Sequence, residues 1–255
     1  MLLVIDVGNT HTVVGVFDQT RLIRDWRIHT EPAATADEFH FLVSFMFKEA
    51  GIQPQIIRKT VISCVVPPLV NMLGTYCKHY LNHLPLWITP ETVKIPILYD
   101  NPSEVGADRL VNAAGAYSRY PTSLIVIDFG TATTFDVISD KGEYIGGAIS
   151  PGVGISAEAL FSRASKLPRV EFEAPGRVIG RTTSDSMKSG IIFGYAELVD
   201  GMVRRIRQEM QPKSPKVIAT GGMAGIIKPH SQTIEAVESG LTLEGLRIIS
   251  EQSET

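Results

Sequence analysis

The sequence predicts an α/β protein built by duplication, with two mixed sheets flanked by helices. One pattern occurs twice, at residues 4–18 (VIDVGNTHTVVGVFD) and 126–139 (VIDFGTATTFDVIS). Each copy has an apolar strand, an Asp, a turn with Gly and Thr, and a second strand. The two aspartates, Asp6 and Asp128, lie about half a chain length apart. Strand-like and helical segments then alternate after both copies, which favours sheets covered by helices.

The first half reads as strand, strand, strand, helix, strand, helix, strand. Alternation and Val/Ile content predict the opening β-meander. Thr35 and Glu38 form a capping box before the first helix, which ends at Gly51. In chain order, the expected elements are strands at 2–7, 12–18 and 21–28, a helix at 37–50, a strand at 60–66, a helix to about His83, and a strand at 85–89.

The second half repeats this order after a bridging helix. Leu110, Val111, Ala114 and Tyr117 mark the apolar face of that helix. We expect an irregular loop over 163–181. The repeated elements are strands at 123–129, 133–139 and 142–149, a helix at 184–210, a strand at 216–220 and a helix at 222–229. We place the two halves at residues 1–110 and 111–255.

Composition excludes several classes of protein. The 255 residues are 44% hydrophobic, enough for real cores, and the net charge is −3. The basic stretch around Arg204, Arg205 and Arg207 is broken by acids, so we expect no nucleic-acid or membrane-surface partner. With no signal peptide or membrane span evident, and with Cys64 and Cys77 outside any metal-binding spacing, a cytoplasmic protein is expected.

The two Gly- and Thr-bearing turns have the chemistry of phosphate loops. In the first, Gly8, Asn9 and Thr10 can present backbone N–H groups and a hydroxyl to a phosphate. Asp6 cannot face a phosphate without a cation between them, which indicates Mg²⁺ and a nucleotide tail. The second loop offers Asp128, followed by Gly130 and Thr131. Two such loops in matched context predict one shared phosphate ligand.

Other glycines are interpreted differently. No Walker A motif occurs, and no strand leads into GxGxxG. The GGAISPG segment from Gly146 suits a tight bend. Thr220-Gly221-Gly222 ends a buried strand without bulky side chains, so a flat adenine or ribose could lie there. A strand-to-helix turn that needs positive φ explains the same glycines.

A third acid, Asp108, precedes Arg109 at the start of the bridging helix. Such a pair is commonly a surface ion pair or a helix cap. A phosphoryl acceptor, however, needs a carboxylate to take its proton, and an anionic acceptor needs a guanidinium to hold it. The sequence VGADR supplies both groups in adjacent positions.

The motifs DVGNTHT, NPSEVGADR, DFGTATT, GGAISPG and ATGG occur in the order found in the type III pantothenate kinases, which this chain resembles over essentially its whole length. The resemblance implies the duplicated ribonuclease H-like fold of the actin, hexokinase and Hsp70 type. It implies transfer of the γ-phosphoryl of ATP to pantothenate, giving 4'-phosphopantothenate, the first step of coenzyme A biosynthesis. It also implies Mg²⁺, a monovalent cation (K⁺ or NH₄⁺), and a homodimer with a shared active site.

By resemblance, Asp108 is the proton acceptor, Asp6 is on the Mg²⁺ side and Asp128 on the monovalent-cation side. Some family members carry a basic residue shortly after GNT, where this chain has Thr12 and Val13, and His11 could fill part of that role. The residues expected to bind ATP and its phosphates are Asp6, Val7, Gly8, Asn9, Thr10, His11, Thr12, Val13, Gly130, Thr131, Gly221 and Gly222. Those expected to bind pantothenate are Tyr99, Gly106, Ala107, Asp108, Arg109 and, from the other subunit, Thr183.

Two other functions fit the same fold. One is a kinase for another small acid or alcohol. The second is a non-catalytic, nucleotide-binding regulator, because close relatives of this family are described as accessory factors for transcription. The set of Asp6, Asp108 and Asp128 favours a catalyst over a regulator.

Overall fold

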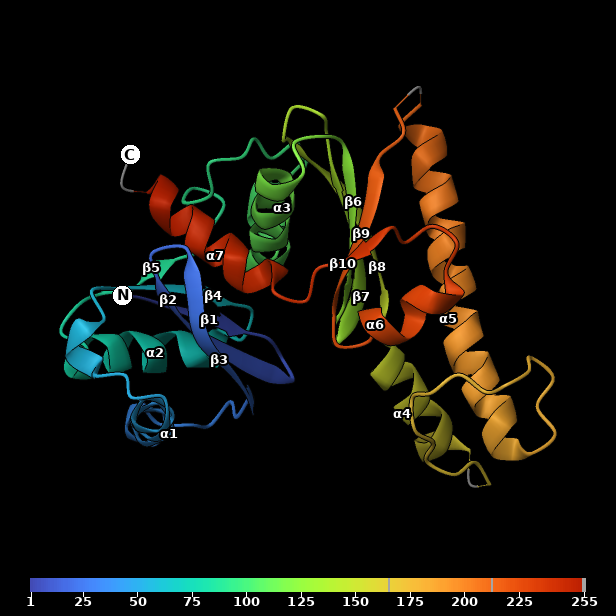
Figure 1. Ribbon diagram of the computed structural model, residues 1–255, viewed down its shortest axis with the longest axis horizontal. Coiled ribbons are helices and arrows are strands. Elements are labelled where there is room, and N and C mark those ends of the chain that lie inside the picture. Colours follow the sequence, from blue (N-terminus) through green and yellow to red (C-terminus); the bar gives the residue numbers. More distant parts are fainter. Residues whose placement is uncertain (165, 212, 254–255) are drawn as a thin grey trace. The chain divides into compact units, whose positions relative to one another are not determined.

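The computed structural model describes residues 1–164, 166–211 and 213–253, which form two compact units (Figure 1). The first unit contains Met1–Ser118 and the segment from Leu241 onward, and the second contains Arg119–Gly240. The boundary expected between residues 110 and 111 therefore falls inside a helix of the first unit. The C-terminal segment, expected to belong to the second half, packs in the first unit.

The first unit contains a five-stranded mixed sheet of order β3-β2-β1-β4-β5. The meander β1-β2-β3 is antiparallel, whereas β4 runs parallel to both β1 and β5. The strands are β1 (Leu2–Val7), β2 (His11–Asp18), β3 (Arg21–His29), β4 (Lys59–Cys64) and β5 (Leu86–Trp87). The alternating apolar residues of β1 and β2 place Leu3, Ile5 and Val14 in the core.

Helices α1, α2, α3 and α7 accompany this sheet in the first unit (Figure 1). Helices α1 and α2 bury their apolar residues in the same core as β1 and β2. Thr35 caps α1 in the expected box: its backbone N–H donates to Glu38 Oε2 over 2.8 Å, and the Glu38 N–H donates to Thr35 Oγ1. The helices are α1 (Ala36–Glu49), α2 (Pro67–Tyr80), α3 (Ala107–Arg119) and α7 (Leu241–Gln252), with short 3₁₀ turns at Pro54–Ile56 (η1) and Pro102–Glu104 (η2).

Helix α7 is an element that the sequence analysis did not predict. It follows the last short strand and packs on α3, where two glycines allow the backbones to approach closely. A Cβ on Gly115 would lie 2.9 Å from the Leu241 carbonyl oxygen, and one on Gly245 would collide with the Val111 carbonyl. Leu243 of α7 also lies against Gly15 of β2, so α7 covers the sheet face opposite α1 and α2.

The second unit repeats the topology of the first. Its sheet order, β10-β9-β6-β7-β8, is that of the first sheet written in reverse, with β6-β7-β8 antiparallel and β9 parallel to β6 and β10. Its elements are β6 (Leu124–Phe129), β7 (Ala132–Ile138), β8 (Tyr144–Pro151), α4 (Val153–Arg163), α5 (Thr183–Glu209), β9 (Lys216–Gly221), α6 (Ala224–Ile227), η3 (Lys228–His230) and β10 (Ala236–Val237). This confirms the predicted duplicated α/β fold.

Asp200 of α5 fastens the segment that leads from η3 into β10. Its carboxylate accepts hydrogen bonds from the Gln232 and Thr233 N–H groups at 2.8 and 3.1 Å, and from the Ser231 and Thr233 hydroxyls at 2.6 Å each. Burial raises the pKa of Asp200, but these hydrogen bonds outweigh it and leave the pKa below its ordinary value. The charged carboxylate therefore stabilises this unit.

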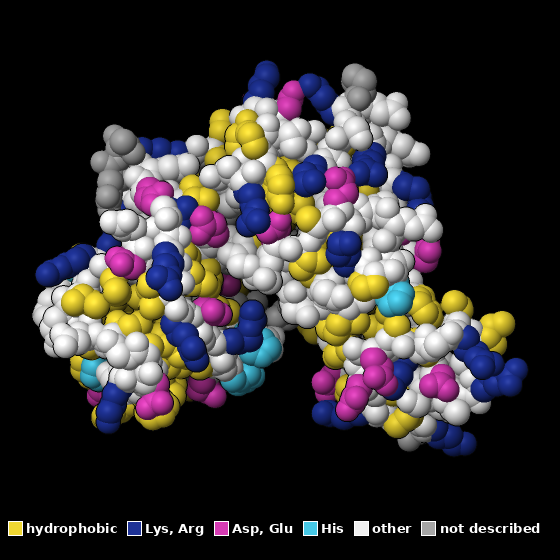
Figure 2. Space-filling view, in the orientation of Figure 1, with side chains coloured by type: hydrophobic (Ala, Val, Ile, Leu, Met, Phe, Trp, Pro, Cys, Tyr) yellow, Lys and Arg dark blue, Asp and Glu magenta, His cyan; other side chains and the backbone are white. Residues whose placement is uncertain are grey.

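The surface carries mixed charge. On the face drawn in Figure 2, basic and acidic side chains are interspersed over both units, in keeping with the net charge of −3. Among the described residues, no helix has the length and apolar character that a membrane span requires.

Candidate active site

The first loop joins β1 to β2 and is a tight turn. The Gly8 N–H donates to the His11 carbonyl over 3.0 Å, which leaves Asn9 and Thr10 exposed at the tip. Thr12 then points into the unit and is 4% exposed. The loop thus presents its tip to solvent while both of its ends are held by the sheet, as a preformed anion cradle requires.

Asp6 lies at the carboxyl end of β1, where its register partner on the parallel strand β4 is Ser63. In-register neighbours on parallel strands point to the same sheet face, about 5 Å apart. Ser63 is fully buried, and its Oγ makes no hydrogen bond to any described residue. A buried serine hydroxyl that makes no such hydrogen bond and lies beside a carboxylate is compatible with a binding site for a hydrated hard cation such as Mg²⁺.

The second loop joins β6 to β7 and repeats the first. The Gly130 N–H donates to the Ala132 carbonyl over 3.0 Å, and the Gly152 N–H donates to the Thr131 carbonyl over 3.1 Å. Asp128 occupies the place of Asp6, with Thr220 of β9 as its parallel register partner. Each aspartate is therefore accompanied by a hydroxyl residue on the neighbouring parallel strand.

Gly221 brings the end of β9 against Asp128. Its φ is +88°, and an added Cβ would lie 2.5 Å from both Asp128 Oδ1 and the Phe129 carbonyl oxygen. Only glycine fits this position. Carboxylate and carbonyl oxygens gathered around a space that a side chain would fill are suitable ligands for a monovalent cation. The exposed Gly222 follows, in the turn before α6.

A third candidate region is the start of α3 in the first unit. The Arg109 N–H donates to Asp108 Oδ1 over 2.8 Å. Gly106 lies under the same carboxylate, since an added Cβ would be 2.6 Å from Oδ1. Burial raises the pKa of Asp108, although the hydrogen bond and the charge of Arg109 act in the opposite direction. A raised carboxyl pKa suits a proton acceptor.

Arg109 is itself buried, with 7% exposure. Tyr99, in the segment before α3, is half-buried and belongs to the same unit. Thr183 is exposed at the first turn of α5 in the second unit, where Thr182 caps the helix by accepting from the Asp185 N–H over 3.1 Å. The structure thus gathers Tyr99 and the Gly106–Arg109 stretch in one unit and places Thr183 in the other.

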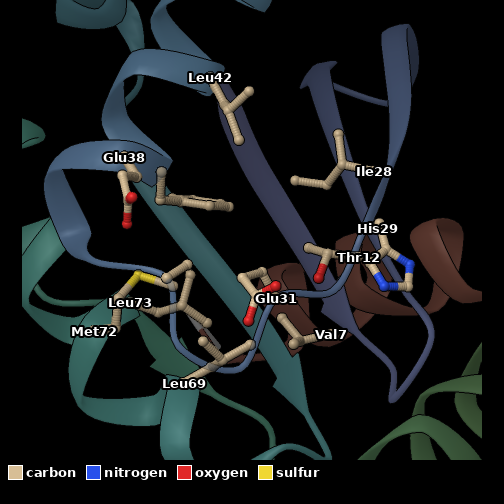
Figure 3. A pocket seen from close by; sticks show the side chains of 12 residues that line it. Val7, Thr12, Ile28, His29, Glu31, Glu38, Leu42, Leu69, Met72 and Leu73 are labelled. Carbon is tan, nitrogen blue, oxygen red and sulfur yellow. The ribbon is translucent and has the colours of Figure 1, made fainter.

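A small cavity lies behind the first loop (Figure 3). It measures about 50 Å³, far below the roughly 300 Å³ and more of typical ligand pockets. Thr12 and His29 lie side by side at one end, and the wall is mainly apolar, formed by Val7, Ile28, Leu42, Leu69, Met72 and Leu73. This cavity is too small for a nucleotide, so the loop's exposed tip is the surface available to a phosphate.

Comparison with known proteins identifies the family. The sequence model of the type III pantothenate kinases matches residues 2–205. The chain belongs to the type III pantothenate kinase family. The type III pantothenate kinase of Desulfatibacillum aliphaticivorans is 64% identical over 251 residues, covering 98% of this chain and 97% of that protein. That of Geobacter sulfurreducens is 54% identical over 254 residues and covers 99% of each chain. The predicted family is confirmed, and with it an ATP-dependent kinase that acts on pantothenate.

Solved structures agree on the fold of this pantothenate kinase family member. Component A of (R)-2-hydroxyglutaryl-CoA dehydratase from Acidaminococcus fermentans superposes with a TM-score of 0.58, at 12% identity, covering 100% of this chain and 99% of that one. A Campylobacter jejuni protein, described as a candidate transcriptional activator of the Baf family, gives 0.61 at 19% identity, covering 99% and 100%. At such identities the likeness concerns the fold alone.

Proposed function

We propose that this chain transfers the γ-phosphoryl group of ATP to the hydroxyl of pantothenate in the cytoplasm, with Asp108 as the proton acceptor. The observation that carries the assignment is the Asp108 carboxylate, which is held by the Arg109 N–H at 2.8 Å and has a pKa raised by burial. The raised pKa makes this carboxylate more basic than an exposed aspartate.

In the proposed reaction the pantothenate hydroxyl oxygen forms a bond to the γ-phosphorus while the bond from that phosphorus to the ADP oxygen breaks. The hydroxyl proton passes to Asp108. Arg109 binds the pantothenate carboxylate, and Tyr99, Gly106 and Ala107 complete its site. Because phosphoryl transfer has a loose transition state, the alignment of donor and acceptor contributes more than the strength of the base.

The phosphates of ATP are assigned to the two loops. In the first, the loop tip from Gly8 to His11 would hold the phosphate tail through backbone N–H groups and a hydroxyl, and Asp6 would act through a cation. Val7, Thr12 and Val13 would hold the two ends of this loop in the sheet. In the second, Gly130 and Thr131 would do the same, and Gly221 and Gly222 would leave room for adenosine.

Two cations are assigned to the loop aspartates. Asp6 and the buried Ser63 hydroxyl fit Mg²⁺, whose chemistry is to neutralise the phosphate charge that develops during transfer. Asp128, together with the carbonyl of Phe129 that approaches Gly221, fits K⁺ or NH₄⁺. In both cases the chain supplies oxygen ligands, which these hard cations prefer.

A homodimer is also proposed, with Thr183 contributing to the partner subunit's pantothenate site. A surface groove of about 510 Å³ runs between α4 and α5 and reaches Thr183, with Ser156, Leu160 and Tyr195 along it. Ile155 and Leu160 of α4 are 50% and 42% exposed. Such apolar side chains suit an interface between two copies. Sedimentation equilibrium tests this, and a monomer at assay concentrations would contradict it.

The test of the function is a steady-state assay of pantothenate phosphorylation, run with K⁺, with NH₄⁺ and with Na⁺ as the monovalent cation. We expect ADP and phosphopantothenate to appear in equal amounts, and faster with K⁺ or NH₄⁺. Phosphorylation of another alcohol or acid in place of pantothenate would overturn the assignment of the acceptor. Equal rates in all three salts would overturn the cation role of Asp128.

A further inference from the structure

The residue that follows the third strand of each meander contacts the preceding phosphate loop. In the first unit Thr30 follows β3, and its N–H donates to the Thr10 carbonyl over 3.0 Å. In the second unit Gly152 follows β8, and its N–H donates to the Thr131 carbonyl over 3.1 Å. The duplicated fold therefore holds both loops with the same backbone hydrogen bond from the same topological position.

Thr30 adds a side-chain contact that Gly152 cannot make. Its Oγ1 donates to the Gly8 carbonyl over 2.7 Å, and it lies 2.9 Å from Thr12 Oγ1 in a second hydrogen bond. Thr30 is 3% exposed and Thr12 is 4% exposed, so water does not substitute easily for either bond. The buried Thr30 hydroxyl thus links Gly8, before the loop tip, to Thr12, after it.

We propose that Thr30 is a positioning residue for the first phosphate loop, acting through the Gly8 carbonyl and Thr12 to hold the loop in the conformation that binds ATP. With both loop carbonyls turned toward Thr30, the peptide groups at the tip are held so that N–H groups face outward. An anion-binding turn depends on this orientation, because a carbonyl turned outward would repel a phosphate. The inference rests on the proposed role of this loop in binding ATP.

Thr30→Val is the central variant, because it keeps the shape of the side chain and removes both hydroxyl bonds. ATP affinity of the full-length protein is measured at equilibrium by titration calorimetry, and kcat and KM for ATP and pantothenate are measured separately. We expect Kd and KM for ATP to rise about tenfold, as for loss of about one net hydrogen bond, with little change in KM for pantothenate. Thr30→Ser keeps the hydroxyl and should restore ATP affinity to within about threefold of the wild type.

Thr60→Val is the matched control. Thr60 is also fully buried in this unit, and its hydroxyl bonds His83 Nε2 at 2.8 Å, three residues before Ser63 on β4. We expect Thr60→Val to lower the free energy of unfolding without lowering ATP affinity. If Thr30→Val proves too unstable, Thr30→Ala and Thr30→Ser supply the same comparison. We expect weak ATP affinity for Thr30→Ala and nearly wild-type affinity for Thr30→Ser.

Several results would overturn the proposal. These are an ATP affinity for Thr30→Val within twofold of the wild type, a Thr30→Ser variant as weak as Thr30→Val, or an equal loss in Thr60→Val. The equilibrium titration keeps this test separate from the proposed reaction. A protein that binds ATP through a Thr30-dependent loop but does not phosphorylate pantothenate would disprove the acceptor and leave the role of Thr30 standing.

Discussion

Replacing Gly106 by Ala should separate catalysis from folding. Gly106 directly precedes α3, and its φ is not positive, so the backbone accepts alanine. The new Cβ would lie 2.6 Å from Asp108 Oδ1, where ordinary contact begins near 3.4 Å. The carboxylate must therefore withdraw by about 0.8 Å. Because Oδ1 ends a side chain that can rotate, the proposed proton acceptor should move while the helix stays in place.

The magnitude follows from this displacement. A misplacement of about 1 Å can lower a catalytic rate by roughly 100-fold, so about 0.8 Å should cost Gly106→Ala roughly 30- to 100-fold in kcat. Exchanging glycine and alanine next to a helix start changes the free energy of unfolding by less than about 1 kcal/mol. ATP affinity should be unchanged, because the first loop lies elsewhere in the unit.

Initial rates at saturating ATP and pantothenate, urea unfolding and an ATP titration measure these three quantities. Gly74→Ala is the matched control: Gly74 lies in α2, and its added Cβ would be 4.0 Å from the Trp87 ring, in ordinary contact. It should keep the wild-type kcat. A Gly106→Ala enzyme with kcat within threefold of the wild type would refute the assignment of Asp108, as would a parallel loss of ATP binding.

Three other predictions follow from single carboxylates. Asp108→Asn should lower kcat about 10²- to 10⁴-fold with ATP affinity retained, and should raise the thermal midpoint at neutral pH because it removes a charge that burial disfavours; near-normal turnover would contradict it. The acid limb of the kcat/KM profile should lie above the pKa of about 3.9 of a free aspartate, and should vanish in Asp108→Asn. Asp200→Ala should lower the free energy of unfolding by about 3 kcal/mol or more at pH 7. Because the pKa of Asp200 is lowered in the fold, the stabilisation by its carboxylate is complete above about pH 4 and is lost as the pH falls further. Urea unfolding of wild type and variant at pH 7 and at pH 3 measures this loss. An equal difference in the free energy of unfolding at the two pH values would contradict the prediction.

The parts of the fold that depend on local sequence were predictable. Alternating apolar residues identified both meanders, and the Thr35–Glu38 box identified the start of α1, because these signals act over a few residues. Helix α7 was missed because its place depends on a glycine contact with α3, more than a hundred residues earlier in the chain. Helix α4 was also not predicted, because only the GGAISPG segment before it was interpreted, as a tight bend.

In the candidate site, too, local motifs were predictable and contacts between distant parts of the chain were not. Motifs indicated Asp6, Asp108 and Asp128 directly. Ser63 and Thr30 carry no motif, because their relevance arises from strand pairing: Ser63 is the register partner of Asp6, and Thr30 reaches Gly8 across the meander. Aligning the two halves against each other would have pointed to Thr30, since Gly152 has the same place after the third strand.

The comparison of Thr30 with Gly152 indicates that the two loops are held differently. At the second loop a Cβ on Gly152 would collide with the carbonyls of Gly130 and Thr131, so the strand end must approach the loop as bare backbone. At the first loop the Thr30 hydroxyl donates to the Gly8 carbonyl and holds it inside the unit, as the proposed phosphate site requires. The position after the third strand, hydroxyl-bearing in one half and glycine in the other, therefore holds the first loop through a side chain and the second through backbone alone.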